Sequence, residues 1–225
     1  MSTDSATDPV IVATARSPIG RAFKGSLTEM RPDDMSAQII TKLLEKVPEL
    51  PKEEIEDLIM GTGSPGGEQG FNIGRATALL AGLGDVPGTT VNRYCSSSLQ
   101  TIRMAAHAIK AGEGDAFIAA GVECVSRYVK GNSDSLPDTL NPIFKGPGAR
   151  SKVRSEGGHG VWTPAEGLAD LYISMGETAE NVAELKGVSR QAMDEYGVMS
   201  QHKAEAAINR GFFELDITPI QLPDG

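Results

Sequence analysis

The sequence predicts an α/β fold, in which strands of a sheet alternate with helices that cross over it in the right-handed sense. Strand-like and helix-like stretches alternate four times between residues 9 and 123. The last strand-like stretch, residues 115–123, is apolar almost throughout. Turns rich in glycine separate these stretches, and the chain contains 26 glycines.

The first half of this pattern contains two strands and two helices. Residues 9–15 (PVIVATA) predict a buried strand, and residues 56–63 predict a second strand that leaves through the glycine-rich stretch 63–70. A helix is expected from Pro32, and another is expected after residue 70. The side chains expected on their apolar faces are Met35, Ile39, Ile40, Leu43 and Leu44 in the first helix and Ile73, Ala76, Leu79 and Leu80 in the second.

The second half of the pattern surrounds a cysteine. Residues 88–92 predict a third strand, and a helix follows Cys95. Its expected apolar face contains Leu99, Ile102, Ala106 and Ile109. Because residues 115–123 carry no alternation of polar and apolar side chains, we expect this fourth strand to be covered on both faces.

The amino-acid composition changes after Arg127, where glycine, proline and small polar residues become frequent. We therefore predict two domains, residues 1–127 and residues 128–225, the second beginning as an irregular excursion. Helices are expected in residues 169–187, ending at Gly187, and in residues 189–211, capped by Ser189. Residues 216–225 predict a strand.

Composition excludes several classes of function. The net charge of −9 argues against nucleic-acid binding. The polar, acidic start lacks the features of a secretory or transit signal, and no apolar stretch is long enough to span a bilayer. Two cysteines make neither a disulfide framework nor a metal site. These features predict a cytoplasmic protein that binds no metal and no membrane.

Cys95 stands where the third strand ends and a helix begins. Backbone N–H groups at a helix start are unpaired, and the helix dipole favours negative charge there. A thiol so placed can supply a thiolate near neutral pH, and its own N–H can donate to an oxyanion. The serines at 96–98 are small and leave room for a substrate. The alternative is that Cys95 is a small core residue, a common role for a lone cysteine.

A nucleophilic thiol usually needs a base, and none of the three histidines is a convincing one. His107 lies on the same predicted helix, about 18 Å from Cys95 at 1.5 Å per residue. His159 falls in the irregular excursion and His202 on the last helix, and no motif surrounds either.

Four stretches of the sequence resemble the thiolase family, which comprises the acetyl-CoA acetyltransferases and the 3-ketoacyl-CoA thiolases. The region around Cys95 is similar to the family's acyl-enzyme cysteine region, and the resemblance extends over most of residues 9–225. The stretches are VNRYCSSSLQT with AIKAGEGDAFIAAGVECVSR (91–127), ATARSPIGRAFKGSL (13–27), GEQGFNIGRATALLAGL (67–83) and MGETAENVAELKGVSRQAMDEYGVMSQHKAEAA (175–207).

The resemblance implies the N-terminal half of an αβαβα layered sandwich, together with part of the family's loop domain. It implies that Cys95 takes an acyl group from a coenzyme A thioester, either in thiolytic cleavage of 3-ketoacyl-CoA, as in fatty-acid β-oxidation, or in the reverse condensation. Coenzyme A is then a substrate, and no cofactor is implied. Met175 and Ser174 match positions near bound coenzyme A, although many relatives have histidine in place of Ser174. Family members are homodimers or tetramers.

Three motifs that the family carries in its second half are absent from the sequence. These are a Gly-His-Pro histidine, an Asn-containing oxyanion motif and a Cys-x-Gly cysteine. We therefore expect the chain to correspond to the N-terminal part of a thiolase and to have no turnover alone. Cys124 is expected to be structural. Two alternatives are a ketoacyl-carrier-protein synthase-like condensing enzyme and a non-catalytic, thiolase-like binding subunit.

Overall fold

The computed structural model describes residues 8–131, 136–144, 153, 156 and 171–225. The chain divides into two compact units, Met1–Ser135 with Glu214–Gly225, and Leu136–Phe213. The division into residues 1–127 and 128–225 stays a prediction.

The first unit contains a parallel sheet of three strands, β1 (Ile55–Gly61), β2 (Gly88–Val91) and β3 (Ala116–Gly121). The strand order is β2-β1-β3, so β1 lies in the middle. Gly61 at the end of β1 is in register with Val91 of β2 and with Gly121 of β3. All three strands therefore reach the same edge of the sheet together.

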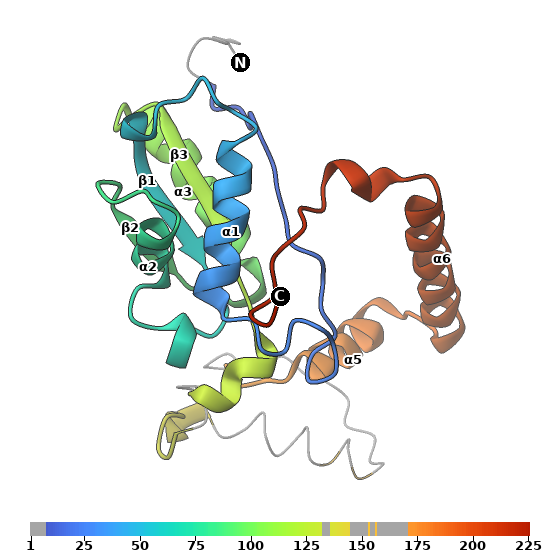
Figure 1. Cartoon of the computed structure of the whole chain (residues 1–225). Helices are drawn as coiled ribbons and strands as arrows, with labels where there is room; N and C mark the ends of the chain where they lie inside the picture. The colour runs from blue at the N-terminus through green and yellow to red at the C-terminus, as the bar shows by residue number, and fades with distance from the viewer. Residues whose placement is uncertain (1–7, 132–135, 145–152, 154–155, 157–170) are drawn as a thin grey trace. The chain divides into compact units, whose positions relative to one another are not determined.

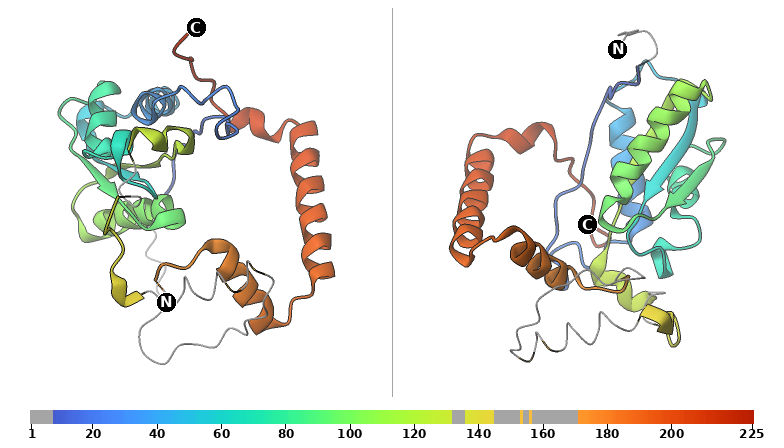
Figure 2. Two further views of the ribbon diagram at one scale, coloured as in Figure 1. Left: turned by 90° about the horizontal axis from the view of Figure 1, so that it is seen from below. Right: turned by 180° about the vertical axis from the view of Figure 1, so that it is seen from behind.

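Helices cover both faces of this sheet. α1 (Pro32–Leu44) and α2 (Ile73–Leu80) pack side by side on one face, and α3 (Ser97–Ala111) lies on the other (Figure 1, Figure 2). The chain moves from β1 outward to β2 and then back across to β3, so right-handed crossovers require α2 and α3 to lie on opposite faces. The expected α/β architecture with a parallel sheet is confirmed.

The core lies mainly between β1 and the α1–α2 layer. Leu58, Met60, Ile73 and Ala78 are completely buried. Pro at the first position of α1 suits a helix start, because the missing N–H would have no partner there. Asn72 caps α2 by accepting a hydrogen bond from the Arg75 N–H.

The second unit contains α5 (Met175–Lys186) and α6 (Arg190–Asn209). Ser174 and Ser189 cap these helices with their hydroxyl groups, and Gly187 ends α5 in the left-handed conformation with φ of 62°. α6 therefore begins and ends close to where the sequence predicts, and α5 ends there, but α5 begins only at Met175 because residues 171–174 are not helical. Short 3₁₀ helices within the described ranges are η2 (Lys52–Glu54), η3 (Gly67–Gln69), η4 (Tyr94–Ser96), η5 (Val125–Lys130), η7 (Pro142–Phe144) and η8 (Phe212–Leu215).

Two of the predicted strands are wrong. Residues 9–15 form no strand, and Val10, Ile11 and Val12 are exposed. Residues 216–225 are also irregular apart from one bridge, between Arg16 and Ile217. A β-branched run becomes a buried strand only where a sheet edge pairs with it, and the sequence does not say whether one does.

The predicted faces of three elements need correction. β3 is an edge strand in which only Ile118 is buried, so it is not covered on both faces. Leu79 and Leu80 of α2 are more than half exposed, as is Leu99 of α3. α3 instead turns its small residues Ser97, Thr101 and Ala105 to the sheet. No helix among the described residues has the length and apolar character needed to cross a membrane.

Candidate active site

An open pocket of about 550 Å³ lies where the three strands end. In parallel α/β sheets, ligands commonly bind outside the carboxyl ends of the strands, next to the point where the strand order reverses. Here the segments after all three strands contribute to the pocket. Its lining residues are 61–64 at the end of β1, then Tyr94, Cys95, Ser97 and Ser98 after β2, and 121–123 at the end of β3, with Tyr128 further along.

Cys95 lies in the middle of η4, the single 3₁₀ turn that joins β2 to α3, and its side chain is exposed. The sequence predicts a position in the first turn of the helix, and the structure places it just before α3 begins at Ser97. Tyr94 has a φ of 44°, in the left-handed region that favours glycine. The chain therefore turns sharply immediately before the cysteine, and the thiol points away from the core.

Side chains on both sides of Cys95 fix this turn. The Ser97 hydroxyl accepts a hydrogen bond from the Arg93 N–H at 2.8 Å and donates to the Tyr94 carbonyl oxygen at 2.6 Å. The Asn92 side chain donates to the carbonyl oxygens of Thr62 at 3.2 Å and Gly63 at 2.8 Å. The turn is thus tied both to itself and to the loop that follows β1.

Two glycines let the start of α3 approach the sheet. A Cβ atom at Gly61 would lie 2.6 Å from the carbonyl carbon of Ser97, and one at Gly121 would overlap the Ser98 hydroxyl. These glycines end the two strands nearest to α3. Any larger residue there would push the turn that carries Cys95 away from the pocket floor.

The backbone N–H of Cys95 belongs to the first turn of a helical segment, where donors lack intrahelical partners. In the part of the chain that the structure describes, no hydrogen bond uses this N–H, whereas those of Tyr94 and Ser96 both have acceptors. It is therefore available to an oxygen atom of a bound molecule. Its use as an oxyanion donor stays a prediction.

Glu123 and Tyr128 line the same pocket, although no motif in the sequence assigns either residue a role. The Tyr128 hydroxyl donates to the Glu123 carboxylate at 2.6 Å. Burial, and secondly the hydrogen bond to this carboxylate, raise the pKa of Tyr128 above its usual range. Tyr128 therefore stays protonated and acts as a donor. One signal could have identified Glu123, which is an ionisable residue two positions beyond the end of a parallel strand.

Cys124 differs from Cys95 in exposure and in acidity. It is partly buried, and its backbone N–H donates to the Gln69 side chain at 2.6 Å. Burial, and secondly the negative charge of Glu123, raise the pKa of the Cys124 thiol to about 11. A thiol of this kind is a poor nucleophile near neutral pH.

The predicted coenzyme A contacts lie in the other compact unit, at the start of α5. Ser174 is the N-cap residue, and its hydroxyl accepts a hydrogen bond from the Glu177 N–H at 3.2 Å. Met175 is the first residue of the helix, and its side chain is 69% exposed. Their roles, and that of Cys95, stay predictions.

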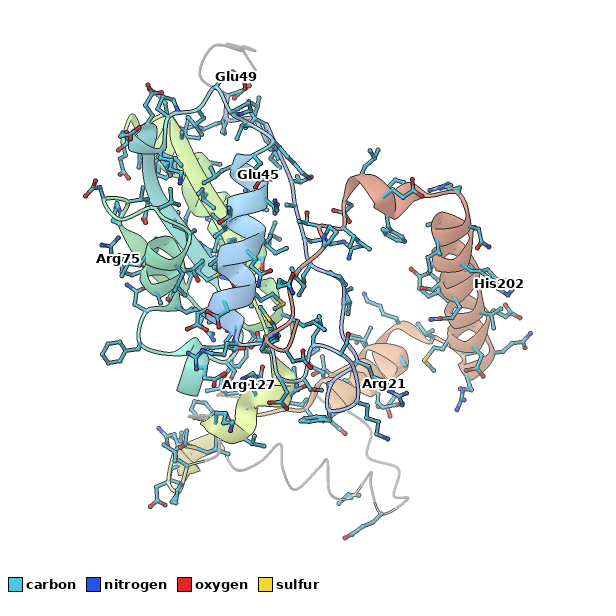
Figure 3. The ribbon with its side chains drawn as sticks, in the orientation of Figure 1. Arg21, Glu45, Glu49, Arg75, Arg127 and His202 are labelled. Atoms are coloured by element: carbon cyan, nitrogen blue, oxygen red, sulfur yellow. The ribbon has the colours of Figure 1, made fainter. Side chains whose placement is uncertain are left out.

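Neither of the two described histidines is among the residues that line the Cys95 pocket, so neither is placed to act as a base for Cys95. His107 is exposed on α3. Figure 3 shows His202, which is exposed on α6. His159 lies outside the described residues. In the described ranges, no cluster of three or more His, Cys, Asp or Glu side chains could hold a metal ion.

The side chains of two arginines are held by structural partners: Arg127, next to the pocket residue Tyr128, and Arg75, in the first turn of α2. Arg127 forms paired hydrogen bonds with Glu68 at 2.5 and 2.7 Å, and burial leaves only 13% of each side chain exposed (Figure 3). The hydrogen bond from Arg127 holds the pKa of Glu68 below its usual range. Arg75 donates to the carbonyl oxygens of Val86 and Gly84, which fixes the turn before β2.

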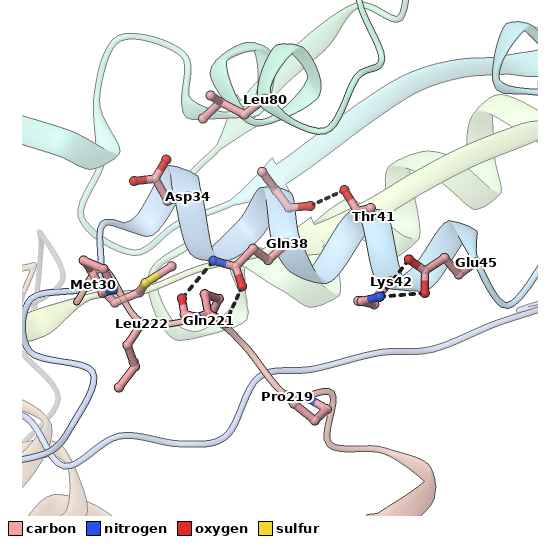
Figure 4. Close-up of a pocket in the computed structure, with 12 residues that line it drawn as sticks. Met30, Asp34, Gln38, Thr41, Lys42, Glu45, Leu80, Pro219, Gln221 and Leu222 are labelled. Carbon is pink, nitrogen blue, oxygen red and sulfur yellow. Dashed lines mark hydrogen bonds and ion pairs between the residues drawn. The ribbon is translucent and has the colours of Figure 1, made fainter. Parts of the chain in front are cut away.

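A second hollow, of about 460 Å³, lies along α1 (Figure 4). The Gln38 amide donates to the Gln221 carbonyl oxygen at 3.1 Å and accepts from its N–H at 2.7 Å. This pairing holds residues near the end of the chain against the helix. No cysteine or histidine lines this hollow, and it shares no lining residue with the Cys95 pocket.

The family model and the relatives described below all belong to the thiolase family. Residues 9–225 match the model described as "Thiolase, N-terminal domain". The chain is 40% identical to a β-ketoadipyl-CoA thiolase of Acinetobacter baylyi, over 95% of the chain and 51% of the relative. It is 38% identical to a 3-ketoacyl-CoA thiolase of Bacillus subtilis (96% and 49%) and to an acetyl-CoA acetyltransferase of Cupriavidus necator (96% and 52%). The chain spans about half the length of these relatives.

Proposed function

Since the chain belongs to the thiolase family and matches its N-terminal domain, we propose that the protein is an acyltransferase that carries acyl groups on Cys95. One structural observation supports this role most strongly. The exposed thiol of Cys95 lies in a pocket formed by the ends of all three strands, beside its own backbone N–H, for which the described residues provide no acceptor.

In the degradative direction, the Cys95 thiolate attacks the 3-keto carbon of a 3-ketoacyl-CoA and forms a carbon–sulfur bond. The C2–C3 bond then breaks, its electron pair passes to C2, and C2 is protonated to give acetyl-CoA. The shortened acyl chain stays on the sulfur as a thioester. The thiolate of a second coenzyme A attacks that thioester, releasing the acyl-CoA and regenerating the Cys95 thiolate.

The described residues supply three parts of this chemistry. The exposed sulfur provides the nucleophile, and the Cys95 N–H stabilises the negative oxygen that forms when the thioester carbonyl is attacked. Ser97 and Asn92 hold the turn in place through the hydrogen bonds given above. The sequence contains no Gly-His-Pro and no Cys-x-Gly motif, so we expect no base or acid for the proton transfers within it.

We further propose that the region around Ser174 and Met175 binds the pantetheine end of coenzyme A. This proposal depends on the family resemblance and on the exposure of Met175 at the start of α5. A homodimeric or tetrameric state and a cytoplasmic location are also part of the proposal.

The test is to expose the 225-residue chain to radiolabelled acetyl-CoA and map the label by mass spectrometry. We expect a hydroxylamine-sensitive acetyl group on Cys95 and none in the Cys95→Ala variant. Label on lysines or on Cys124 alone would refute the acyltransferase role and favour a binding subunit. The same chain is expected to give no thiolytic cleavage of acetoacetyl-CoA.

A further inference from the structure

The carboxylate of Glu123 accepts hydrogen bonds from residues 62–69, which follow β1, and from Tyr128, which follows β3. Its Oε2 atom accepts from the Gly63 N–H at 2.6 Å. Its Oε1 atom accepts from the Gln69 amide at 2.6 Å, from the Tyr128 hydroxyl at 2.6 Å and from the Thr62 hydroxyl at 3.3 Å. Every one of these donors is neutral, so they form charge-assisted hydrogen bonds without a counter-ion.

The loop that Glu123 holds is the same loop on which the Cys95 turn rests. The carbonyl oxygens of Thr62 and Gly63 accept from the Asn92 side chain, and the Thr62 carbonyl also lies 3.2 Å from the Ser97 hydroxyl. The loop therefore donates to the carboxylate on one side and accepts from the cysteine turn on the other. A displacement of this loop would be passed directly to η4.

Close packing also connects Glu123 to Gly63. A Cβ atom built on Gly63 would lie 2.8 Å from the Glu123 Oε2 atom, so this glycine is needed for the carboxylate to reach the backbone N–H. Glu123 is itself exposed at the pocket wall. Its hydrogen bonds therefore fix local geometry more than they contribute to burial of the core.

We propose that Glu123 is a positioning residue, which sets the place of Cys95 through the loop of residues 62–63. The carboxylate orients the Gly63 peptide, and the carbonyl oxygens of the loop orient Asn92 and Ser97, which hold the cysteine turn. This inference rests on the proposed acyl transfer to Cys95 for its functional meaning, but the geometry can be tested without it.

Glu123→Gln is the variant to test, because an amide is nearly isosteric but offers one acceptor oxygen where the carboxylate uses two. Its NH₂ group must then face a group that can only donate, either the Gly63 N–H or the NH₂ of Gln69. Glu113→Gln is the matched control, since Glu113 is exposed in the turn after α3 and the substitution removes the same charge. Gly63→Ala disrupts the same contact from the other partner.

The first readout is amide hydrogen exchange in the 225-residue chain. We expect Glu123→Gln to accelerate exchange in residues 61–64 and 92–97 by at least about threefold, with no change in α1 or in the urea midpoint. Gly63→Ala is expected to do the same, and the double variant to add little to either. Unchanged exchange in residues 92–97 in both variants would overturn the proposal.

The second readout is the rate at which acetyl-CoA labels Cys95. We expect Glu123→Gln and Gly63→Ala to lower this rate about tenfold, while Glu113→Gln leaves it unchanged, because small misplacements of a reacting group are costly. A normal labelling rate in both pocket variants would overturn the positioning role. If the unsubstituted chain acquires no label, the proposed function fails, and the exchange measurement alone decides whether Glu123 positions the turn.

Discussion

The Asn92 side chain donates a hydrogen bond to the Gly63 carbonyl oxygen at 2.8 Å, and this contact joins the turn after β2 to the loop after β1. The same side chain accepts from the Tyr94 N–H through its own oxygen at 3.3 Å. Asn92 therefore uses both ends of its amide to hold the turn that presents Cys95. An aspartate could keep only the second of these roles.

We accordingly predict that Asn92→Asp lowers the free energy of unfolding by about 1–2 kcal/mol, because a carboxylate would face the carbonyl oxygens of Thr62 and Gly63. Asn92→Ala loses the same donors without adding a charge, so its loss should be smaller. Urea unfolding of the two variants measures the difference. Equal stability of the aspartate and alanine variants would contradict the assigned contact.

The contact between Gly121 and Ser98 predicts a coupling. Gly121→Ala is expected to cost about 1–3 kcal/mol, since the new Cβ atom would overlap the Ser98 hydroxyl. In a Ser98→Gly background much of that cost should disappear, which gives a coupling energy of at least about 1 kcal/mol in a double-mutant cycle. Gly84→Ala is the control, because nothing lies within 4 Å of a Cβ atom at that position. Additive effects would show that α3 does not approach β3 in this way.

The two cysteines should differ sharply in reactivity. With a pKa raised to about 11, the Cys124 thiol is ionised in only about one molecule in a thousand at pH 8, and it is partly buried. Iodoacetamide at pH 8 should therefore modify the exposed Cys95 first, and Cys124 only after unfolding in urea. Peptide mapping over time measures this order, with Cys95→Ala as the control. Equal modification of both cysteines in the folded chain would be inconsistent with the structure.

The half-buried carboxylate of Asp57 in β1 predicts that Asp57→Asn stabilises the fold by an amount that depends on pH. Burial raises the pKa of Asp57, and its Oδ1 atom has no hydrogen-bond partner among the described residues. At pH 7 the charged carboxylate is disfavoured in the folded state, so Asp57→Asn should raise the free energy of unfolding, by an amount limited by the solvent that still reaches the group.

The stability advantage of Asp57→Asn should decrease as the pH falls. Because the folded-state pKa lies above the unfolded value, the unsubstituted chain regains stability as the pH falls through the raised pKa and the group is protonated. The advantage of Asp57→Asn should therefore shrink by pH 4. Urea unfolding at both pH values measures it, and an advantage that grows toward low pH would be contrary to this account.

The sequence predicts the elements whose signals are local. α6 begins after its expected cap Ser189, α5 ends at the expected Gly187, and α1 starts at a proline followed by acidic residues. The junction that carries Cys95 was also expected, because a strand pattern stops just before the cysteine. These features depend on neighbours along the chain and not on distant packing.

Features that depend on distant contacts were not predicted. The face of α3 was assigned to Leu99 and Ile102, because their spacing suits a helix, but both are exposed. The actual contact uses Ser97 and Thr101, since Gly61 and Gly121 leave space only for small side chains.

Likewise, Glu123 is connected to Gly63 across 60 positions in the sequence. No local pattern shows that a glutamate will meet the loop after another strand. Only its place beyond the end of a parallel strand could have drawn notice.

The central claim is that the folded chain prepares Cys95 to accept an acyl group. The most direct measurement compares the rate at which acetyl-CoA acetylates Cys95 in the folded chain with the rate for the same cysteine in the urea-unfolded chain at equal pH, after correction for the effect of urea on a small thiol. We predict that the folded chain reacts at least about tenfold faster, because a fixed N–H donor stabilises the oxyanion. A rate equal to or below that of the unfolded chain would contradict the claim.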